Sequence, residues 1–354
     1  MNFKKIFFST VLLSLCLFIT EGATRILFHF LSWDIKAYQI DGGRYQVEPF
    51  RAYGLTPGWE LNHESLKETY NSQGFKSPEF TIKKSDDIYR IVVLGGSSVY
   101  GNYGNDKTWS QFLNEYLEQK KDISFNKSFE VINTGIPGYN SFHTLSLLIN
   151  NVLDYNPDLI ILYQMWNDFS YWPYVNDSTL YSQSNFNKTE SILNKSYLFT
   201  SIVTLKRVIV KDLTNEKFLP KKVTYGNNNS IKGGLERYKK NIEIMAMICN
   251  RYNIPLIISS QLTLYHQKNS LEELKILNKG NNQFYINSFR QGSDILKDIS
   301  KKYKKNIFYY NPQNNIKVNL EIMRDHIHPT EKGNLFLAND LGEYILGNIN
   351  FQDQ

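Results

Sequence analysis

Cysteine is scarce in this sequence, whose 354 residues include two, Cys16 and Cys249. Cys16 falls in an apolar N-terminal run and Cys249 in a segment with the pattern of a helix, so we expect no disulfide between them. Two cysteines cannot assemble a metal cluster, and we expect no metal and no other cofactor. The lack of a disulfide does not exclude work outside the cytoplasm, because a chain this long can bury an adequate core without one.

Dense runs of one charge and phosphate-binding motifs are also missing. Lys and Arg number 40 against 34 Asp and Glu, and the net charge is +6. The basic residues are dispersed and form no stripe that would follow a phosphate backbone, so no nucleic-acid partner is expected. A Walker lysine and a G-x-G-x-x-G spacing are absent, which argues against nucleotide binding. Hydrophobic residues make up 42% of the chain, as in a globular domain with a large core.

The N-terminus has the features of a membrane anchor. Lys4 and Lys5 precede residues 6–20, which carry no charge. That length suits the apolar region of an export signal and is shorter than a usual spanning helix. Glu21 interrupts the place of a small-residue cleavage site, and apolar character resumes at residues 26–33. We expect residues 1–33 to be an uncleaved, single-pass signal anchor in the cell membrane, with the rest of the chain extracytoplasmic. Secretion after signal cleavage is the alternative.

The remaining chain shows the alternation of an α/β domain. Residues 34–87 contain several Gly and Pro residues and are interpreted as an extended lead-in that packs on the domain at 88–350. Within that domain, strands separated by helices predict a parallel sheet with helices on both faces. Residues 169–230 have no clean period and are interpreted as an insertion. Strands are expected at 91–94, 129–132, 159–163, 254–258 and 307–310, and helices at 109–119, 235–252, 289–303 and 330–346.

Four short segments carry groups suited to acyl transfer. Ser97, Gly138 and Asn167 each lie just past the end of a predicted strand, where parallel sheets place their ligands. Asp325 and His328 are three residues apart, close enough to share one loop. Ser97 can attack as nucleophile, His328 can take its proton, and Asp325 can orient the imidazole. The backbone N–H groups of Ser97 and Gly138 and the Asn167 side chain can bind a developing oxyanion.

Neighbouring residues offer competing assignments. His326 lies beside the proposed base, but its side chain should point elsewhere, and His143 is expected to be structural. Thr330 is a suitable N-cap for the last helix and would fix the loop before it. The G-x-S-x-G elbow of another hydrolase fold is absent, because Val99 stands where its second glycine would fall.

The four segments together resemble the SGNH hydrolase superfamily, also called GDSL-type esterases. The resemblance covers about residues 88–348 and implies a flavodoxin-like three-layer α/β/α sandwich. It carries the nucleophile onto Ser97 and the oxyanion donors onto Gly138 and Asn167. It carries the acid and base onto Asp325 and His328.

Two positions depart from the pattern of this superfamily. Gly96 stands in place of the aspartate of the Gly-Asp-Ser block, which leaves the nucleophile unchanged. Met165 replaces the glycine that usually opens the Gly-x-Asn-Asp block, and we expect it to narrow the pocket near Asn167.

The resemblance implies a serine esterase that cleaves an O-acyl bond, such as an O-acetyl ester. An N-terminal anchor before such a domain resembles bacterial cell-envelope members, so the expected partners are an acylated small molecule or glycan and the membrane. Trp166 and Trp172 flank Asn167 and are candidates for stacking on sugar rings, or else they fix the insertion to the domain. An O-acyltransferase using the same site and a non-catalytic glycan-binding module remain alternatives.

Overall fold

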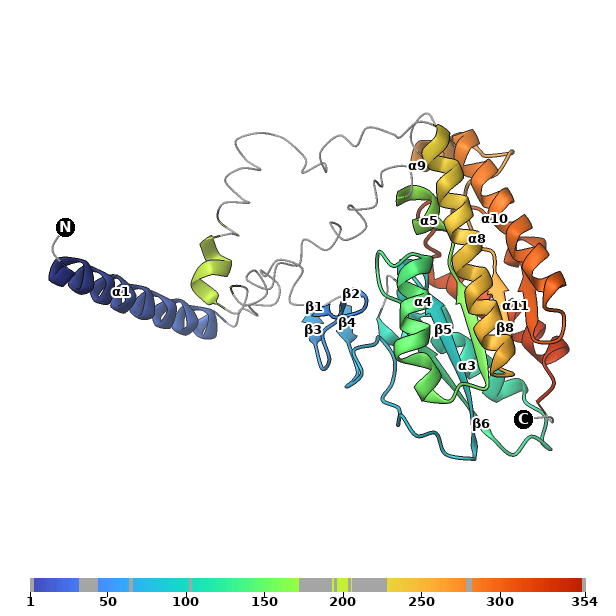
Figure 1. The fold of residues 1–354 in the computed structure, drawn as a ribbon, viewed down its shortest axis with the longest axis horizontal. Coiled ribbons are helices and arrows are strands. Elements are labelled where there is room, and N and C mark those ends of the chain that lie inside the picture. Colours follow the sequence, from blue (N-terminus) through green and yellow to red (C-terminus); the bar gives the residue numbers. More distant parts are fainter. Residues whose placement is uncertain are drawn as a thin grey trace.

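The computed structural model describes residues 3–31, 44–63, 66–101, 104–171, 193, 196–202, 205, 228–277 and 282–351 (Figure 1). Most of the predicted insertion at 169–230, Trp172 included, lies outside these residues. The described part contains a long N-terminal helix, two short antiparallel hairpins, and a layered domain of parallel strands and helices.

The domain is built on a five-stranded parallel sheet in the order β6-β5-β7-β8-β9. Within this sheet, β6 lies on one side of β5, and β7, β8 and β9 follow in chain order on its other side, which is the flavodoxin-like order. In register, Val92 of β5 pairs with Ile132 of β6 and with Ile160 of β7. β7 is fully buried, as expected for a strand covered by helices on both faces. The strands are β5 (Ile88–Gly95), β6 (Ser128–Asn133), β7 (Leu159–Tyr163), β8 (Leu256–Ser259) and β9 (Ile307–Tyr310).

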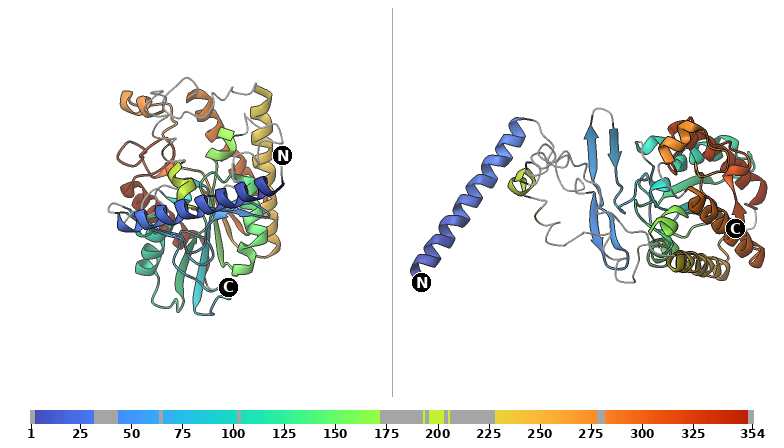
Figure 2. Two further views of the ribbon diagram at one scale, coloured as in Figure 1. Left: turned by 90° about the vertical axis from the view of Figure 1, so that its left-hand side faces the viewer. Right: turned by 90° about the horizontal axis from the view of Figure 1, so that it is seen from above.

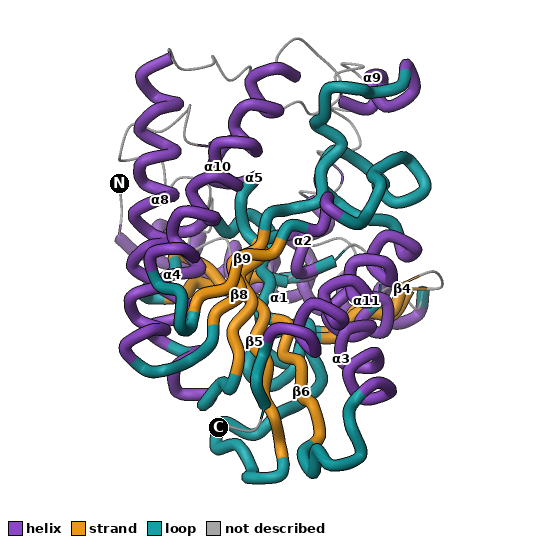
Figure 3. Tube along the Cα trace, turned by 90° about the vertical axis from the view of Figure 1, so that its right-hand side faces the viewer, coloured by secondary structure: helices purple, strands orange, loops and turns teal. Residues whose placement is uncertain are grey.

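Helices cover both faces of this sheet, which confirms the predicted α/β/α class. On one face α3 (Trp109–Lys120) packs against α11 (Glu331–Asn348), and on the other α8 (Asn228–Arg251) packs against α4 (Ser141–Asn150) and α10 (Asn282–Lys302) (Figure 3). The expected N-cap of α11 is present, since the Thr330 hydroxyl accepts from Gly333 N–H at 3.0 Å. The shorter helices are α2 (Ser97–Tyr100), α5 (Trp166–Tyr171) and α9 (Leu271–Leu277), with 3-10 turns η3 (Asn105–Lys107), η4 (Val152–Tyr155) and η6 (Pro312–Asn314).

The segment before the domain contains two antiparallel hairpins that the sequence did not predict. They are β1 (Tyr45–Glu48) with β2 (Ala52–Leu55), and β3 (Glu60–His63) with β4 (Leu66–Thr69). Aromatic side chains in and beside these hairpins join the core of the domain: Tyr53 of β2 is buried, as are Trp59 and Tyr70, which flank the β3–β4 hairpin.

A buried ionic cluster also joins these hairpins to the domain. The Glu68 carboxylate pairs with Arg44 at 2.8 Å and with Lys76 at 3.4 Å, and it accepts from the Tyr100 hydroxyl of α2. The lead-in therefore contacts the short helix that begins at Ser97.

Helix α1 (Phe3–Phe30) is continuous over 28 residues and does not break at Glu21. By length and composition, the part of this helix from Lys4 to Phe30 could cross a membrane. Most of its side chains are exposed, and Phe28 is an exception at 4%. Phe28 contacts the ring of Tyr197 edge-on, and α1 lies apart from the sheet in Figures 1 and 2.

Candidate active site

Ser97 is the first residue of α2 and is separated from the end of β5 by Gly96 alone. Its hydroxyl oxygen lies 2.8 Å from Nε2 of His328. The next serine has a different partner, because the buried Ser98 hydroxyl donates to the Ile327 carbonyl at 3.1 Å. The geometry therefore distinguishes the two serines: Ser97 faces the imidazole, and Ser98 holds the loop that carries it.

The glycines before Ser97 are sites of close approach. A Cβ on Gly95 would lie 2.5 Å from the Tyr163 carbonyl oxygen. A Cβ on Gly96 would lie 2.7 Å from Nδ2 of Asn167 and 2.9 Å from the Tyr139 carbonyl oxygen. Contacts below 3.0 Å require a neighbour to shift, so the space that an aspartate at position 96 would need is occupied in this chain.

Asp325 and His328 share one loop, as the sequence suggested. Nδ1 of His328 lies 2.8 Å from Oδ2 of Asp325, and Oδ1 also accepts from the backbone N–H groups of Ile327 at 3.0 Å and His328 at 2.9 Å. Burial of Asp325 works against its ionisation. The hydrogen bonds and charge of His328 and the two backbone donors outweigh burial and hold the Asp325 pKa well below its usual range. The group therefore stays a carboxylate at neutral pH.

The same loop carries His326, which faces the other way. Its Nδ1 is 3.9 Å from Asp325, and its ring lies 4.3 Å from that of Trp166. Its carbonyl accepts from the Thr263 hydroxyl and the Leu264 N–H, both at 3.0 Å. Burial lowers the pKa of His326. His326 thus packs against aromatic rings while His328 faces Ser97.

Gly138 lies in a turn at the carboxyl end of β6. The Tyr139 N–H donates to the Ile136 carbonyl at 3.1 Å, and Gly138 has a φ of +83°. Proline at the first central position and a left-handed residue at the second define a type II turn, which glycine accommodates without strain. Among the described residues, the N–H groups of Gly138 and Ser97 have no protein acceptor. Both donors are available for a ligand.

Asn167 lies on α5, just after β7. One hydrogen of its amide donates to the Tyr139 carbonyl at 2.7 Å, which leaves the second hydrogen for another acceptor. The residue is 5% exposed, so its amide is held in place by its surroundings. The structure thus brings β5, β6 and β7 termini together at one edge of the sheet.

Asp168 has a role that the sequence reasoning missed. It is completely buried, and its carboxylate accepts from the N–H and hydroxyl of Ser141 and from the amide of Gln164. It therefore holds the first turn of α4 against α5. The signal that could have revealed it is its position directly after Asn167.

His143 is structural, since its Nδ1 lies 2.8 Å from Asn140 Oδ1 in a capping box and burial lowers its pKa to about 4.

Trp166 and Met165, both expected near the substrate, pack against other parts of the domain. The Trp166 ring stacks on Tyr265 at 5.6 Å and lies 4.8 Å from Tyr285. Met165, which we expected to narrow the pocket near Asn167, is completely buried. A Cβ on Gly292 of α10 would lie 2.4 Å from its terminal methyl, so the side chain points toward α10.

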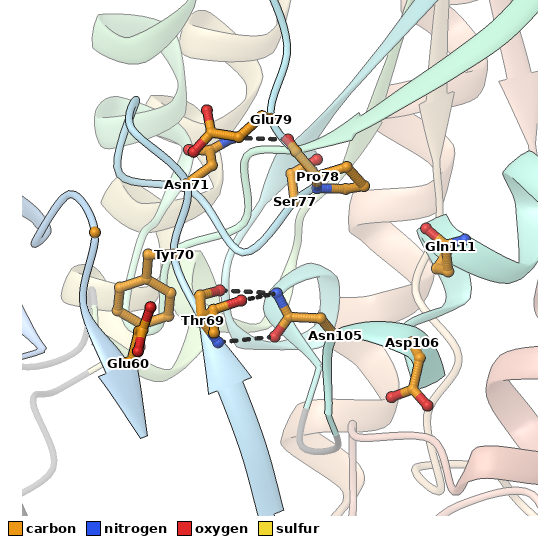
Figure 4. A pocket seen from close by; sticks show the side chains of 11 residues that line it. Glu60, Thr69, Tyr70, Asn71, Ser77, Pro78, Glu79, Asn105, Asp106 and Gln111 are labelled. Atoms are coloured by element: carbon orange, nitrogen blue, oxygen red, sulfur yellow. Dashed lines mark hydrogen bonds between the residues drawn. The ribbon is translucent and has the colours of Figure 1, made fainter. Parts of the chain in front are cut away.

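A pocket of about 510 Å³ lies between the β3–β4 hairpin and the start of α3 (Figure 4). Asn105, in its wall, donates to the Thr69 carbonyl at 2.8 Å and accepts from the Thr69 N–H at 3.1 Å. Its lining includes neither Ser97 nor His328, so this pocket is separate from the candidate site. In the part of the chain that the structure describes, no group of three or more His, Cys, Asp or Glu side chains is arranged to hold a metal ion.

A parallel sheet with a hydrogen-bonded Ser–His–Asp set at the carboxyl ends of its strands defines a serine hydrolase type of site. The family model for GDSL-like lipases and acylhydrolases matches residues 91–341. The chain belongs to this family, which confirms the resemblance seen in the sequence, and it is an enzyme that hydrolyses ester bonds.

Several solved structures are similar to the chain. A lipolytic protein of the G-D-S-L family from Desulfitobacterium hafniense DCB-2 is 13% identical, with 72% of this chain and 98% of that chain covered and a TM-score of 0.42. A GDSL-like lipase from Bacteroides thetaiotaomicron VPI-5482 is 14% identical, with coverages of 74% and 89% and a TM-score of 0.41. Axe2, an acetylxylan esterase from Geobacillus stearothermophilus, is 11% identical, with coverages of 74% and 95% and a TM-score of 0.44. Among curated proteins, none matches significantly.

Proposed function

We propose that this chain is a serine esterase that cleaves an O-acyl bond with Ser97, His328 and Asp325. The observation that carries the proposal is the continuous hydrogen-bonded series from Ser97 Oγ to His328 Nε2, and from His328 Nδ1 to Asp325, at 2.8 Å for both links. Because Asp325 stays ionised, it favours the imidazole tautomer with its proton on Nδ1. In that tautomer Nε2 can accept the Ser97 proton.

The reaction runs in two half-steps. Ser97 Oγ attacks the ester carbonyl carbon while His328 Nε2 takes its proton, and the carbonyl oxygen becomes an oxyanion. The N–H groups of Ser97 and Gly138 and the free amide hydrogen of Asn167 stabilise this charge. The intermediate collapses to an acyl-serine, and His328 returns the proton to the departing alkoxide. Water then attacks the acyl-serine by the same route, which releases the carboxylic acid and restores Ser97.

Activity-based labelling tests this assignment. A fluorophosphonate should form an adduct whose peptide map points to Ser97, and S97A should lose labelling and ester hydrolysis while its melting curve stays near that of the wild type. S98A is the matched comparison, because Ser98 lies beside the nucleophile but donates to Ile327. It should keep fluorophosphonate labelling at Ser97, and any loss of turnover should come with a lower melting temperature. Activity that survives in S97A and disappears in S98A would overturn the assignment of the nucleophile.

An acylated small molecule or glycan, such as an O-acetylated sugar of the cell envelope, is the proposed substrate. Packing occupies much of the Trp166 ring, so the sugar-stacking part of this proposal depends on Trp172. Product analysis with an acetylated oligosaccharide and a second sugar as acceptor separates the candidate reactions. Free acetate indicates a hydrolase, acyl transfer to the acceptor indicates an O-acyltransferase, and binding without turnover indicates a non-catalytic glycan-binding protein.

We further propose that α1 anchors the chain in the cell membrane with the domain outside. Supporting this, the charged Glu21 within α1 is hydrogen-bonded rather than free. It pairs with Arg25 at 2.8 Å and accepts from the Ser196 hydroxyl at 2.7 Å and from the Leu198 N–H at 2.9 Å. Such bonds lower the cost of a carboxylate in or near a bilayer. A reporter fused after Gln354 should be active outside the cytoplasm. Activity in the cytoplasm alone would contradict this topology, and a shortened N-terminus on the mature protein would favour secretion after cleavage.

A further inference from the structure

One tyrosine of the lead-in contacts the turn that carries Gly138. The Tyr53 hydroxyl, from β2, donates to the Pro137 carbonyl at 2.7 Å. In return, the Tyr139 hydroxyl donates to the Tyr53 carbonyl at 2.5 Å, and the two rings meet edge-on at 5.2 Å. Tyr53 therefore contacts the residues on both sides of Gly138.

The Pro137 carbonyl belongs to the same peptide unit as the Gly138 N–H. A trans peptide is planar, and its C=O and N–H point in opposite directions. A group that fixes the direction of the Pro137 oxygen therefore fixes the direction of the Gly138 hydrogen. The hydrogen bond to the oxygen also polarises the peptide and makes its N–H a stronger donor.

The direction of the Gly138 N–H depends on the type of turn that residues 136–139 adopt. In type I and type II turns the central peptide points to opposite sides, and φ of +83° at Gly138 corresponds to type II. A Cβ on Gly138 would lie 2.6 Å from the Tyr53 hydroxyl oxygen, so the hydroxyl sits tightly on this side of the turn. Tyr53 is only 9% exposed, and its ring cannot readily move away.

We propose that Tyr53 is a positioning residue for the oxyanion site. Its hydroxyl holds the central peptide of the 136–139 turn in the type II orientation and so aims the Gly138 N–H at the substrate oxyanion. The inference rests on the proposed function, in which Gly138 is an oxyanion donor. It adds that a residue outside the four site segments, on the lead-in between the N-terminal helix and the domain, contributes to the rate of the chemical step.

Kinetics of Y53F in the full-length protein in detergent micelles test the proposal. Losing an entire oxyanion donor costs about 10²- to 10³-fold in kcat, so loosening one should lower kcat by roughly 10-fold. KM for a small aryl acetate should stay within about twofold, because the ground-state carbonyl depends less on this donor. Affinity for a boronic acid, which forms a tetrahedral adduct on serine, should fall by the same factor as kcat/KM.

Y344F is the matched control, since the Tyr344 hydroxyl also donates to a backbone carbonyl, that of Tyr309 at 3.0 Å. It should leave kcat and boronate affinity unchanged. A general loss of folding would instead reduce the concentration of active sites, which titration with a fluorophosphonate measures. Equal kinetics of Y53F and Y344F per active site would overturn the inference.

A double-mutant cycle with G138A separates an effect of Tyr53 through Gly138 from a general effect of Y53F on folding. If Tyr53 acts through the Gly138 donor, Y53F should cause no further loss in a G138A background, and removal of the nearby hydroxyl should recover part of the activity. Multiplied losses would overturn the inference. The proposed function fails separately, if S97A retains activity. Loss of activity in S97A with no effect of Y53F would remove only the role of Tyr53.

Discussion

The Asp325→Asn substitution isolates the contribution of the carboxylate to catalysis. Oδ1 of Asp325 accepts hydrogen bonds from the backbone N–H groups of Ile327 and His328. Oδ2 accepts a hydrogen bond from Nδ1 of His328. An asparagine oxygen can keep both backbone bonds, so the loop should retain its shape. The amide nitrogen then faces Nδ1, which forces the proton of the imidazole onto Nε2 and removes the acceptor for Ser97.

The whole loss should therefore appear in turnover. We expect kcat for an aryl acetate to fall by about 10³- to 10⁴-fold. At 1.36 kcal/mol per tenfold change, this corresponds to about 4 to 5.5 kcal/mol of transition-state stabilisation. Asp122→Asn is the matched control: Oδ1 of Asp122 accepts from the Ser124 N–H at 2.8 Å in the same local pattern, in a loop before β6. Its kcat should not change.

The pH dependence of stability gives a second measure. The folded-state pKa of Asp325 lies below the usual 3.8, so the carboxylate stabilises the fold above that pH. This stabilisation is lost as the pH falls from about 4 toward the folded-state value. Asp325→Asn should therefore remove part of the acid sensitivity of the melting temperature. A variant that keeps kcat within about threefold of the wild type would refute the role of Asp325 and leave a Ser–His dyad.

Three further substitutions test the surroundings of the site. Gly96→Asp, which restores the usual residue of the family, should lower stability by roughly 1–3 kcal/mol in a denaturant titration because Asn167 occupies the space; unchanged stability would show that this region can relax. Asp168→Asn should cost about 1–3 kcal/mol by the same measurement, since an amide cannot accept all of the buried donors, and a smaller cost would contradict its structural role. Trp172→Ala should raise KM for an acetylated oligosaccharide but not for an aryl acetate. Equal losses on both substrates with a lowered melting temperature would favour anchoring of the insertion.

The central sheet could be predicted from the sequence because its strands are apolar runs bounded by glycine or polar residues. Strands β7 (Leu159–Tyr163) and β9 (Ile307–Tyr310) have the expected bounds, and α3 differs from its prediction by one residue at its end. Strand β8 (Leu256–Ser259) begins later than predicted, after Pro255, whose ring lacks the N–H that a central strand uses.

The lead-in hairpins could not be predicted in the same way. Each of their strands has four residues, too few to show an alternating pattern, and their stability comes from burying aromatic rings against the domain. The side on which Met165 packs was also hidden, because a residue just past a strand can face either the site or the neighbouring helix layer. In this chain Gly292 of α10 leaves room for its methyl group.

In three segments, the residue that follows a proposed catalytic group ties that segment to another part of the chain. Ser98 follows the nucleophile and holds the Ile327 carbonyl. Asp168 follows Asn167 and holds the start of α4 at Ser141. Each tie connects strands or loops that are distant in sequence, so each fixes the relative positions of two groups that must act on one carbonyl.

Tyr139 completes this arrangement, since it follows Gly138 and donates to the lead-in at Tyr53. A site that stabilises a transition state needs its donors held to within a fraction of an ångström, and these ties provide that constraint. Substitutions of the catalytic residues and of the residues that follow them should therefore differ in their effects on turnover and melting temperature. A change at Ser97 lowers turnover and leaves the melting temperature unchanged. A change at its neighbour Ser98 lowers the melting temperature, and turnover falls as a consequence.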